Sequence, residues 1–510
     1  MQRVSALAML AQGMQNGTLL AAVDLGSNSY RLEIGRHDHG QVQRVEYLKE
    51  SVRQGAGLDE ARNLTPEAMQ RGWDCLARFG ERLAGFGKNQ VRAVATQTLR
   101  EAREARNRDV FLERARQILG FPIDVISGRE EARLIYQGVA HQLPQSEERR
   151  LVVDIGGRST ELILGHQYDS EATESYRVGS VAWSMRYFPD GVFTEDAFKR
   201  AEVAAQAILD EAANRYSPSE WSLAYGSSGT INAIGEILEA AGRGPGITRD
   251  GLDWLMKQLL AAGNADRVRL VGLKDDRRPV IGGGMSVLLA VFHLLDIESM
   301  TPAVGALRHG VLYDLIDRDQ REGDVRSATV QRLATRFGVD LAQARRVGEV
   351  AAGLLHQLCG ASEDADTLAR HERKLRWAAM LHEIGSLVSH SDYHKHGAYI
   401  LDNADAAGFA LPELHRLGLL VLGHRGKLRK LENELADEDF VHQLLCLRLA
   451  VILCHARRDP DLDGLALDAR RGGFRLTLRP EWARDFPQSG HLLREECVAW
   501  QKTPWSLSLA

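Results

Sequence analysis

The stretch that decides the fold is Ala21-Ala22-Val23-Asp24-Leu25-Gly26-Ser27-Asn28-Ser29, followed by apolar Tyr30, Leu32 and Ile34 at alternate positions. The apolar run before Asp24 predicts a buried strand, and the alternation after the loop predicts a returning strand. The glycine lets backbone N–H groups converge on an anion, and the hydroxyls add further donors. The segment therefore indicates a strand–loop–strand unit that is suited to holding phosphate.

The same pattern returns 130 residues later, where Asp154 repeats the place of Asp24. The second segment is Leu151-Val152-Val153-Asp154-Ile155-Gly156-Gly157-Arg158-Ser159-Thr160, again with alternating apolar residues behind it. An internal repeat of this kind predicts two similar lobes that face each other. Strand and helix patterns alternate around both segments, which is typical of α/β lobes.

A third glycine and hydroxyl loop, Gly226-Ser227-Ser228-Gly229-Thr230, opens a predicted helix in the second lobe. Any one such loop is also compatible with an ordinary hairpin turn. Three in one chain, two of them echoing, favour a shared phosphate cleft. Asp24 and Asp154 add hard oxygen ligands for Mg²⁺.

Adjacent glutamates open another predicted helix, and they have different explanations. Ser127 and Glu130 have the spacing of a capping box, so helix initiation explains Glu130. Glu131 lacks that explanation and is a candidate to hold and deprotonate a water; the alternative is that it favours the positive end of the helix. Arg100, at the end of a predicted strand, is either a phosphate clamp or a solvated arginine.

The composition is that of a soluble globular protein. Of 510 residues, 44% are apolar and 26% charged, which predicts two to four domains and excludes dominant disorder. The five cysteines form no CxxC pair, so a reducing cytoplasm is expected. Apolar runs fall short of the roughly 20 residues that cross a bilayer. The net charge of -5 is small and does not indicate a polyanion ligand, so any site for a polyanion must be formed by a local group of residues.

The expected organisation has five parts. They are a disordered tail over 1–19, a first lobe over 20–135, a second lobe over 136–312, a helical region over 313–455 and a small domain over 456–510. Glycine loops stop after about residue 311, and long helical patterns then dominate, with a strand expected over 473–478.

The order and intervals of five motifs resemble the exopolyphosphatase and guanosine pentaphosphate phosphohydrolase family, most closely a bacterial exopolyphosphatase. The motifs are AAVDLGSNS (21–29), ATQTLRE (95–101), SGREEARL (127–134), VVDIGGRSTEL (152–162) and GSSGTI (226–231). The resemblance implies two ribonuclease H-like lobes of the actin, hexokinase and Hsp70 superfamily. It also implies a helical carboxy-terminal region that is similar to an HD domain.

The resemblance assigns roles to particular residues. Glu131 becomes the catalytic carboxylate, Arg100 contacts substrate phosphate, and Asp154 and Glu161 hold Mg²⁺ and the attacking water. The loops are lined by Asp24, Ser27, Asn28, Gly156, Gly157, Ser159, Thr160, Ser227, Ser228, Gly229 and Thr230. Two positions depart from the family pattern: Arg158 replaces a usual glycine, and His309 replaces a usual acidic residue.

The HD-like region departs further, because its dyad is His382-Glu383 where a metal-binding HD domain has His-Asp. His390, His394, His396 and His424 follow, but no final aspartate is evident, so a degenerate, structural fold is expected. A basic stripe in this region is either a solvated face or a guide for a polyanion. Its members are Arg416, Arg425, Lys427, Arg429 and Lys430.

The expected function is a Mg²⁺-dependent exopolyphosphatase that releases orthophosphate processively from inorganic polyphosphate. The alternative is hydrolysis of pppGpp to ppGpp, which presents the same terminal phosphoanhydride. A kinase of the superfamily is disfavoured by the paired Glu130 and Glu131. A non-catalytic sensor is disfavoured by the intact set of Glu131, Asp154 and Glu161. A cytoplasmic homodimer is expected, with no nucleic-acid partner and no integral membrane contact.

Overall fold

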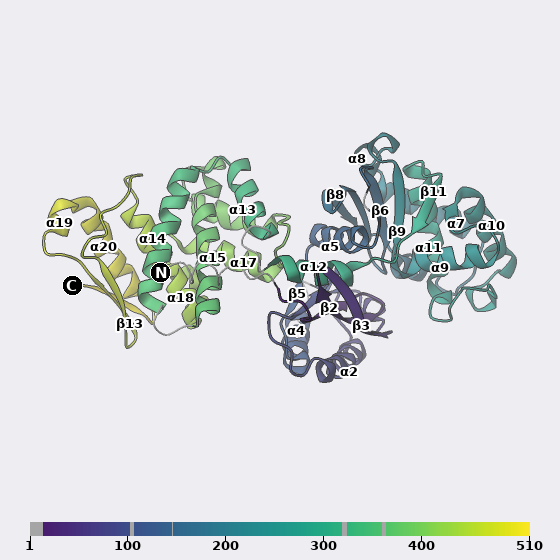
Figure 1. Cartoon of the computed structure of the whole chain (residues 1–510), viewed down its shortest axis with the longest axis horizontal. Coiled ribbons are helices and arrows are strands. Elements are labelled where there is room, and N and C mark those ends of the chain that lie inside the picture. The colour runs from purple at the N-terminus through teal and green to yellow at the C-terminus, as the bar shows by residue number, and fades with distance from the viewer. Residues whose placement is uncertain (1–13, 103–106, 145, 319–323, 360–363) are drawn as a thin grey trace. The chain divides into compact units, whose positions relative to one another are not determined.

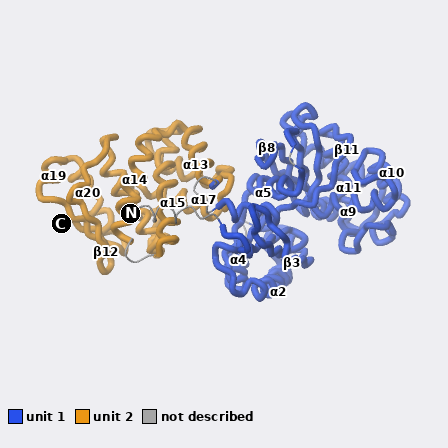
Figure 2. Tube along the Cα trace, viewed as in Figure 1, with its two compact units in different colours: residues 1–324 blue, residues 325–510 orange. Residues whose placement is uncertain are grey.

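The computed structural model describes residues 14–102, 107–144, 146–318, 324–359 and 364–510. Residues 1–13 of the expected tail lie outside this described part. The chain divides into two compact units, Met1–Asp324 and Val325–Ala510 (Figure 2).

The first lobe is built on a sheet that extends the strand–loop–strand unit around Asp24. Its strand order is β3 (Gln41–Glu50), β2 (Tyr30–Asp38), β1 (Leu19–Leu25), β4 (Val91–Ala95) and β5 (Ile123–Val125). Strand β1 runs antiparallel to β2 and parallel to β4. Helices α2 (Pro66–Arg82) and α4 (Asn107–Leu119) pack against each other. The Thr65 side chain accepts from the Ala68 N–H and fixes where α2 begins.

The second lobe repeats this topology, as the sequence echo predicts. Its strand order is β10 (Ile247–Thr248), β11 (Ser299–Pro302), β9 (Leu223–Ser227), β6 (Arg150–Ile155), β7 (Thr160–His166) and β8 (Asp169–Tyr176). Strand β6 is antiparallel to β7 and parallel to β9, as β1 is to β2 and β4. Its helices include α6 (Ser180–Tyr187), α7 (Glu195–Leu209), α9 (Ser228–Ala240), α10 (Arg249–Ala262) and α11 (Ile281–Leu294).

The lobes exchange helices, and this exchange joins them (Figure 1). Helix α5 (Gly128–Ala140) follows the first sheet but packs on β7 and β8 of the second. Helix α12 (Leu307–Arg318) follows the second sheet but packs on β1 and β2 of the first. The two helices also pack on each other, and apolar residues of both sheets and both helices share one core. The expected boundaries after residues 135 and 312 therefore fall inside these helices.

Glycines let α5 and α12 approach at backbone distance. A Cβ placed on Gly310 would lie 1.7 Å from the Leu134 carbonyl oxygen, and one on Gly138 would lie 2.2 Å from the Ala306 carbonyl oxygen. Since no side chain fits in such a gap, glycine is required at this crossing.

The second unit is mostly helical. Its helices include α13 (Val325–Arg336), α14 (Leu341–Cys359), α15 (Ala365–Leu381), α16 (Tyr393–Asn403), α17 (Leu411–Gly423), α18 (Glu438–Leu453) and α20 (Pro487–Trp500). The expected strand over 473–478 is β13 (Gly473–Thr477), which lies between β12 (Ala466–Arg470) and β14 (Ser506–Leu509). Phe474, Leu476 and Leu507 of this sheet belong to the same core as the helices. Among the described helices, none is both long and apolar enough to cross a membrane.

Candidate active site

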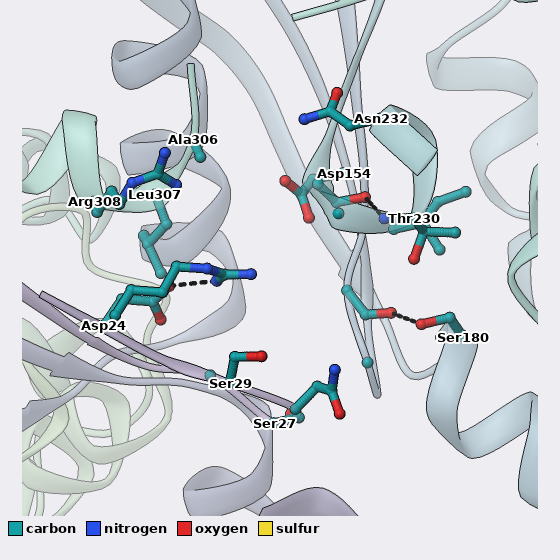
Figure 3. A pocket seen from close by; sticks show the side chains of 18 of the residues that line it. Asp24, Ser27, Ser29, Asp154, Ser180, Thr230, Asn232, Ala306, Leu307 and Arg308 are labelled. Carbon is teal, nitrogen blue, oxygen red and sulfur yellow. Dashed lines mark hydrogen bonds and ion pairs between the residues drawn. The ribbon is translucent and has the colours of Figure 1, made fainter. Parts of the chain in front are cut away.

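A cavity of about 250 Å³ opens between the two lobes of the first unit. Figure 3 shows Asp24 and Arg308 facing Asp154, Thr230 and Asn232 across it. The predicted residues that line the cavity are Asp24, Ser27, Asn28, Glu131, Asp154, Gly156, Gly157, Ser159, Ser228, Gly229 and Thr230. The three glycine and hydroxyl loops thus meet in one place, as the sequence predicts.

Backbone hydrogen bonds hold both hairpin loops in shape. The Gly156 N–H donates to the Ser159 carbonyl at 2.9 Å, and the Gly55 N–H donates to the Ser27 carbonyl at 2.7 Å. A Cβ on Gly157 would lie 3.2 Å from the Ser27 Cβ. The loops of the two lobes therefore touch, and glycine permits that approach.

Two of the predicted loop hydroxyls donate to backbone carbonyls and do not line the cavity. The Thr160 hydroxyl is buried and donates to the Val178 carbonyl at 2.6 Å. The Ser227 hydroxyl is buried and donates to the Gly305 carbonyl at 2.9 Å. Neither residue is among those that line the cavity. Ser227 also hydrogen-bonds the Asp154 carboxylate, which does line it.

Glu131 projects into the cavity from the first turn of α5. The Ser127 hydroxyl accepts from the Glu130 N–H and caps this helix, as the spacing predicts. Arg100 donates through Nη1 to Glu131 Oε2 at 2.7 Å and to the Ile126 carbonyl at 3.0 Å. Arg100 is not among the lining residues, so in this structure it positions the Glu131 carboxylate and does not itself face the phosphate space.

The Glu130 carboxylate has a larger role than helix capping. Its side chain is fully buried and accepts from Arg133 Nε at 2.8 Å. Arg133 also binds Asp314 of α12, which in turn binds Arg92 of β4. Glu130 therefore belongs to a buried ion network that ties α5 to α12 and to the first sheet, a role that the capping pattern did not reveal.

Three acidic residues at the site, Asp154, Glu131 and Glu161, have raised pKa values. Burial raises the pKa of Asp154 to about 6, and the neighbouring Asp24 carboxylate acts in the same direction. Burial also raises the pKa of Glu131, against the lowering effect of Arg100. The pKa of Glu161 is raised well above its usual value by burial and by the charge of Glu131. A site of this kind favours bound protons or cations.

The residues expected to hold Mg²⁺ lie on neighbouring strands. Asp154 and Glu161 are directly opposite in the β6–β7 register, which puts their side chains on one face of the sheet. Asp154 lines the cavity, whereas Glu161 is buried and accepts from the Ser175 hydroxyl at 2.7 Å. In the described part of the chain, no group of three or more His, Cys, Asp or Glu side chains could hold a metal ion. Mg²⁺, however, needs one or two carboxylates when phosphate oxygens and water complete its shell.

Basic residues that the sequence analysis missed line the cavity: Arg31, Lys49, Lys274, Arg277 and Arg308. Arg31 and Lys49 are cross-strand neighbours on β2 and β3. Arg31 Nη1 is 2.9 Å from Asp24 Oδ2. The alternation of Tyr30 and Leu32 already placed Arg31 on the opposite face of its strand, and that signal could have found it. Arg277 lies in a loop, where no periodic pattern indicates the direction of a side chain.

The two departures from the family pattern have structural explanations. Arg158 Nη2 lies 2.6 Å from Glu101 Oε2, and its Nη1 donates to the Gly55 carbonyl at 3.0 Å. Arg158 therefore links the lobes. His309 accepts from the Ala306 N–H at 3.0 Å and lies 3.2 Å from Glu33, so it anchors the start of α12.

The basic stripe of the second unit is broken up. Arg416 Nη1 is 2.5 Å from Asp437 Oδ2. The Arg425 guanidinium lies 4.7 Å from the centre of the Tyr393 ring, and Lys430 donates to the Arg425 carbonyl at 3.0 Å. Arg429 lies in a short 3-10 helix that begins after Lys427. Arg416, Arg425 and Lys430 therefore each have a different partner within the second unit.

Three histidines of the HD-like region, His382, His394 and His424, form a buried cluster. The His382 and His424 ring centres lie 5.3 Å apart, and those of His394 and His424 lie 6.3 Å apart. Burial lowers the pKa of all three, and that of His394 falls to about 4. His390 is exposed, outside this cluster. Neutral, buried rings are what a structural core requires.

Comparisons with known proteins place both units in one family. The profile of the Ppx/GppA phosphatase family matches residues 33–319, and the profile of Ppx/GppA phosphatase, domain III, matches residues 325–496. Two relatives, both named guanosine-5'-triphosphate,3'-diphosphate pyrophosphatase, match over almost the whole chain. The Vibrio cholerae protein is 40% identical over 96% of this chain and 98% of its own. The Aeromonas hydrophila protein is 37% identical over 97% and 99%.

Solved structures match the lobes. A crystal structure of an exopolyphosphatase-like protein is 25% identical, with a TM-score of 0.53 over 59% of this chain and 98% of that one. The Aquifex aeolicus member of the Ppx/GppA family is 25% identical, with a TM-score of 0.50 over 60% and 99%. A Cytophaga hutchinsonii exopolyphosphatase, 23% identical with a TM-score of 0.52 over 59% and 98%, shares the fold. The predicted family and fold class are confirmed.

The prediction of an exopolyphosphatase is wrong. The full-length relatives are named for guanosine-5'-triphosphate,3'-diphosphate, which matches the alternative reading. Both substrates end in the same phosphoanhydride, so the loop and carboxylate motifs could not separate them.

Proposed function

Because this chain belongs to the Ppx/GppA phosphatase family, we propose that it converts guanosine pentaphosphate (pppGpp) to guanosine tetraphosphate (ppGpp) and orthophosphate. The chain is a phosphoanhydride hydrolase. The observation that carries the choice of substrate is the name shared by relatives that match nearly the whole chain at about 40% identity. The cavity between the lobes supports the proposal, because it combines anion-binding loops with a carboxylate.

The loops and cations bind the 5'-triphosphate. The backbone N–H of Gly157 and the Ser27 hydroxyl donate to phosphate oxygens. Arg31 and Arg277 add positive charge where the terminal phosphate gains negative charge during reaction. The fixed loop backbones need no rearrangement to do so.

Glu131 acts on the attacking water. It accepts the water's proton as the oxygen attacks the terminal phosphorus, and the bond from that phosphorus to the bridging oxygen breaks. The bridging oxygen leaves on the shortened nucleotide. The Arg100 contact keeps the Glu131 carboxylate aimed into the cavity, and the raised pKa of Glu131 strengthens it as a proton acceptor.

Asp154 and Asp24 are the carboxylates that would hold Mg²⁺. Both line the cavity on facing lobes, and buried carboxylates with repelling charges fit a hard divalent cation. When bound, the ion neutralises charge on the phosphate oxygens. Glu161 behind Asp154 accepts from Ser175 and orients the strand end beside that site.

The test compares phosphate release from pppGpp, inorganic tripolyphosphate and ATP by purified protein, with and without Mg²⁺. We expect the highest kcat/KM on pppGpp, with ppGpp as the nucleotide product on chromatography and with loss of activity in EDTA. Preference for tripolyphosphate over pppGpp, or a product other than ppGpp, would overturn the proposal.

We also propose that the protein is cytoplasmic and that it forms a homodimer. The chain's five cysteines form no disulfides, and thiols persist in a reducing compartment. Cell fractionation and light scattering of the purified protein test these two points.

A further inference from the structure

A second cavity of about 260 Å³ adjoins the phosphate cavity, and both are lined by Ser27 and Asn28. We propose that this second cavity, named here the base pocket, holds the guanine of the nucleotide while its 5'-phosphates occupy the first. The inference rests on the proposed function and adds where the base is recognised.

The base pocket is apolar where the phosphate cavity is polar. Its apolar wall comes from α6 and from the segment before α11: Val181, Met185, Phe188, Pro189, Pro279 and Val280. Phe188 is held at its place by Phe193 and Phe198, whose ring centres lie 5.7 and 4.8 Å away. A flat, apolar and aromatic ligand is what such a wall binds. Inorganic polyphosphate has no such part.

The pocket lies between the lobes, so a bound base contacts both. Ala56 and Arg53 line it from the first lobe, and the Arg53 N–H donates to the Asn28 carbonyl at 2.8 Å. Met185 and Val280 line it from the second. Because Asn28 lies in the phosphate loop, the base and the phosphates are bound by adjoining residues.

Asp276 supplies the selectivity for guanine. It lines the base pocket, its side chain is 30% exposed, and its Oδ2 accepts from Lys49 at 3.0 Å. A carboxylate accepts hydrogen bonds from the N1–H and the 2-amino group of guanine, and adenine offers no such pair. Lys49 lines the phosphate cavity, so this ion pair joins the two cavities.

The first test blocks the pocket. Ala56→Trp and Met185→Glu each change an exposed wall residue, and Val203→Trp, on the exposed face of α7, is the matched control. We expect both pocket variants to raise KM for pppGpp about tenfold or more, since stacking of a base contributes roughly that factor. KM for inorganic tripolyphosphate should change less than about twofold, and the control should match wild type on both substrates.

Equal changes for pppGpp and tripolyphosphate, or none in either pocket variant, would overturn the inference. Failure of the proposed function gives a different result. In that case the wild-type protein hydrolyses tripolyphosphate and does not hydrolyse pppGpp.

The second test addresses selectivity. Inhibition constants of ppGpp and of its adenine analogue are compared in wild type, Asp276→Asn and Asp275→Asn. Asp275 is the adjacent carboxylate, 86% exposed and paired with Arg278. We expect the preference for the guanine nucleotide to fall about tenfold in Asp276→Asn alone, the scale of one lost charged hydrogen-bond pair. An unchanged preference in Asp276→Asn would remove Asp276 from the inference.

Discussion

At the scale of single residues, neighbours in the sequence have unlike roles because they point in different directions from one helix. Glu131 faces the cavity and Arg100, whereas Glu130 is buried beside Arg133. Consecutive residues on a helix are about 100° apart around its axis, so adjacent carboxylates meet different surroundings.

Glu131→Gln should lower kcat for pppGpp by about a hundredfold or more, the usual effect of losing a general base. KM should stay near its wild-type value, because the loops that bind phosphate are unchanged. Steady-state kinetics and a thermal unfolding curve measure both effects. Near-normal turnover would show that another group accepts the proton.

Glu130→Gln should instead destabilise the protein, by about 2 kcal/mol, because the buried network would lose one of the two carboxylates that neutralise Arg133. Arg133 would keep its ion pair with Asp314 and would face an uncharged amide in place of the Glu130 carboxylate. Urea unfolding measures this loss. If Glu130→Gln kept wild-type stability and lost turnover, the roles of the two glutamates would have to be exchanged.

Arg100→Gln should move the acidic limb of the kcat–pH profile to higher pH. Arg100 lowers the pKa of Glu131, so without the guanidinium the carboxyl stays protonated to a higher pH and is inactive as a base there. Activity should recover as pH rises, and Arg100→Lys should give a smaller displacement because it keeps the charge. A profile that falls in height without moving would contradict this positioning role.

At the scale of elements, the crossing of α5 and α12 decides how the lobes face each other. Their backbones meet at Gly138 and Gly310, and the same helices carry Glu131 and the arginine Arg308 into the cavity. The geometry of the site therefore depends on a contact that lies outside it.

Gly310→Ala should destabilise the first unit, by about 3 kcal/mol, because its Cβ would lie 1.7 Å from the Leu134 carbonyl oxygen. Gly353→Ala, within α14, is the control: a Cβ there meets nothing within 4 Å. That change should leave stability the same or raise it by up to about 1 kcal/mol. Equal effects of the two changes on urea unfolding would show that the crossing can relax.

At the scale of the whole molecule, the two compact units have separate cores. The core of the second unit draws all its residues from Val330 to Leu507, and the core around α5 and α12 lies wholly in the first. A chain with separate cores is expected to fold in parts.

A fragment of residues 325–510 should therefore fold without the lobes. We expect a helical far-UV circular dichroism spectrum and a cooperative urea transition, with no phosphate release from pppGpp. The fragment of residues 14–324 should be the one that binds nucleotide. A 325–510 fragment that is unfolded, or that hydrolyses pppGpp, would contradict this division.

The sequence alone determined the repeated strand–loop–strand units, the helix cap at Ser127 and the carboxylate Glu131. These features depend on local rules: period-two alternation, glycine turns and side-chain spacing within a few residues. The same alternation also predicts that Arg31 lies on the face of its strand away from Tyr30 and Leu32.

Only the tertiary structure decided the role of Glu130 in a buried network, the inward hydrogen bonds of Thr160 and Ser227, and the joining of Asp276 to Lys49. Each depends on which distant segments meet. Lys49 and Asp276 belong to different lobes, and their contact follows from how α5 and α12 cross. Local patterns cannot report a distance that is set by packing across the whole first unit.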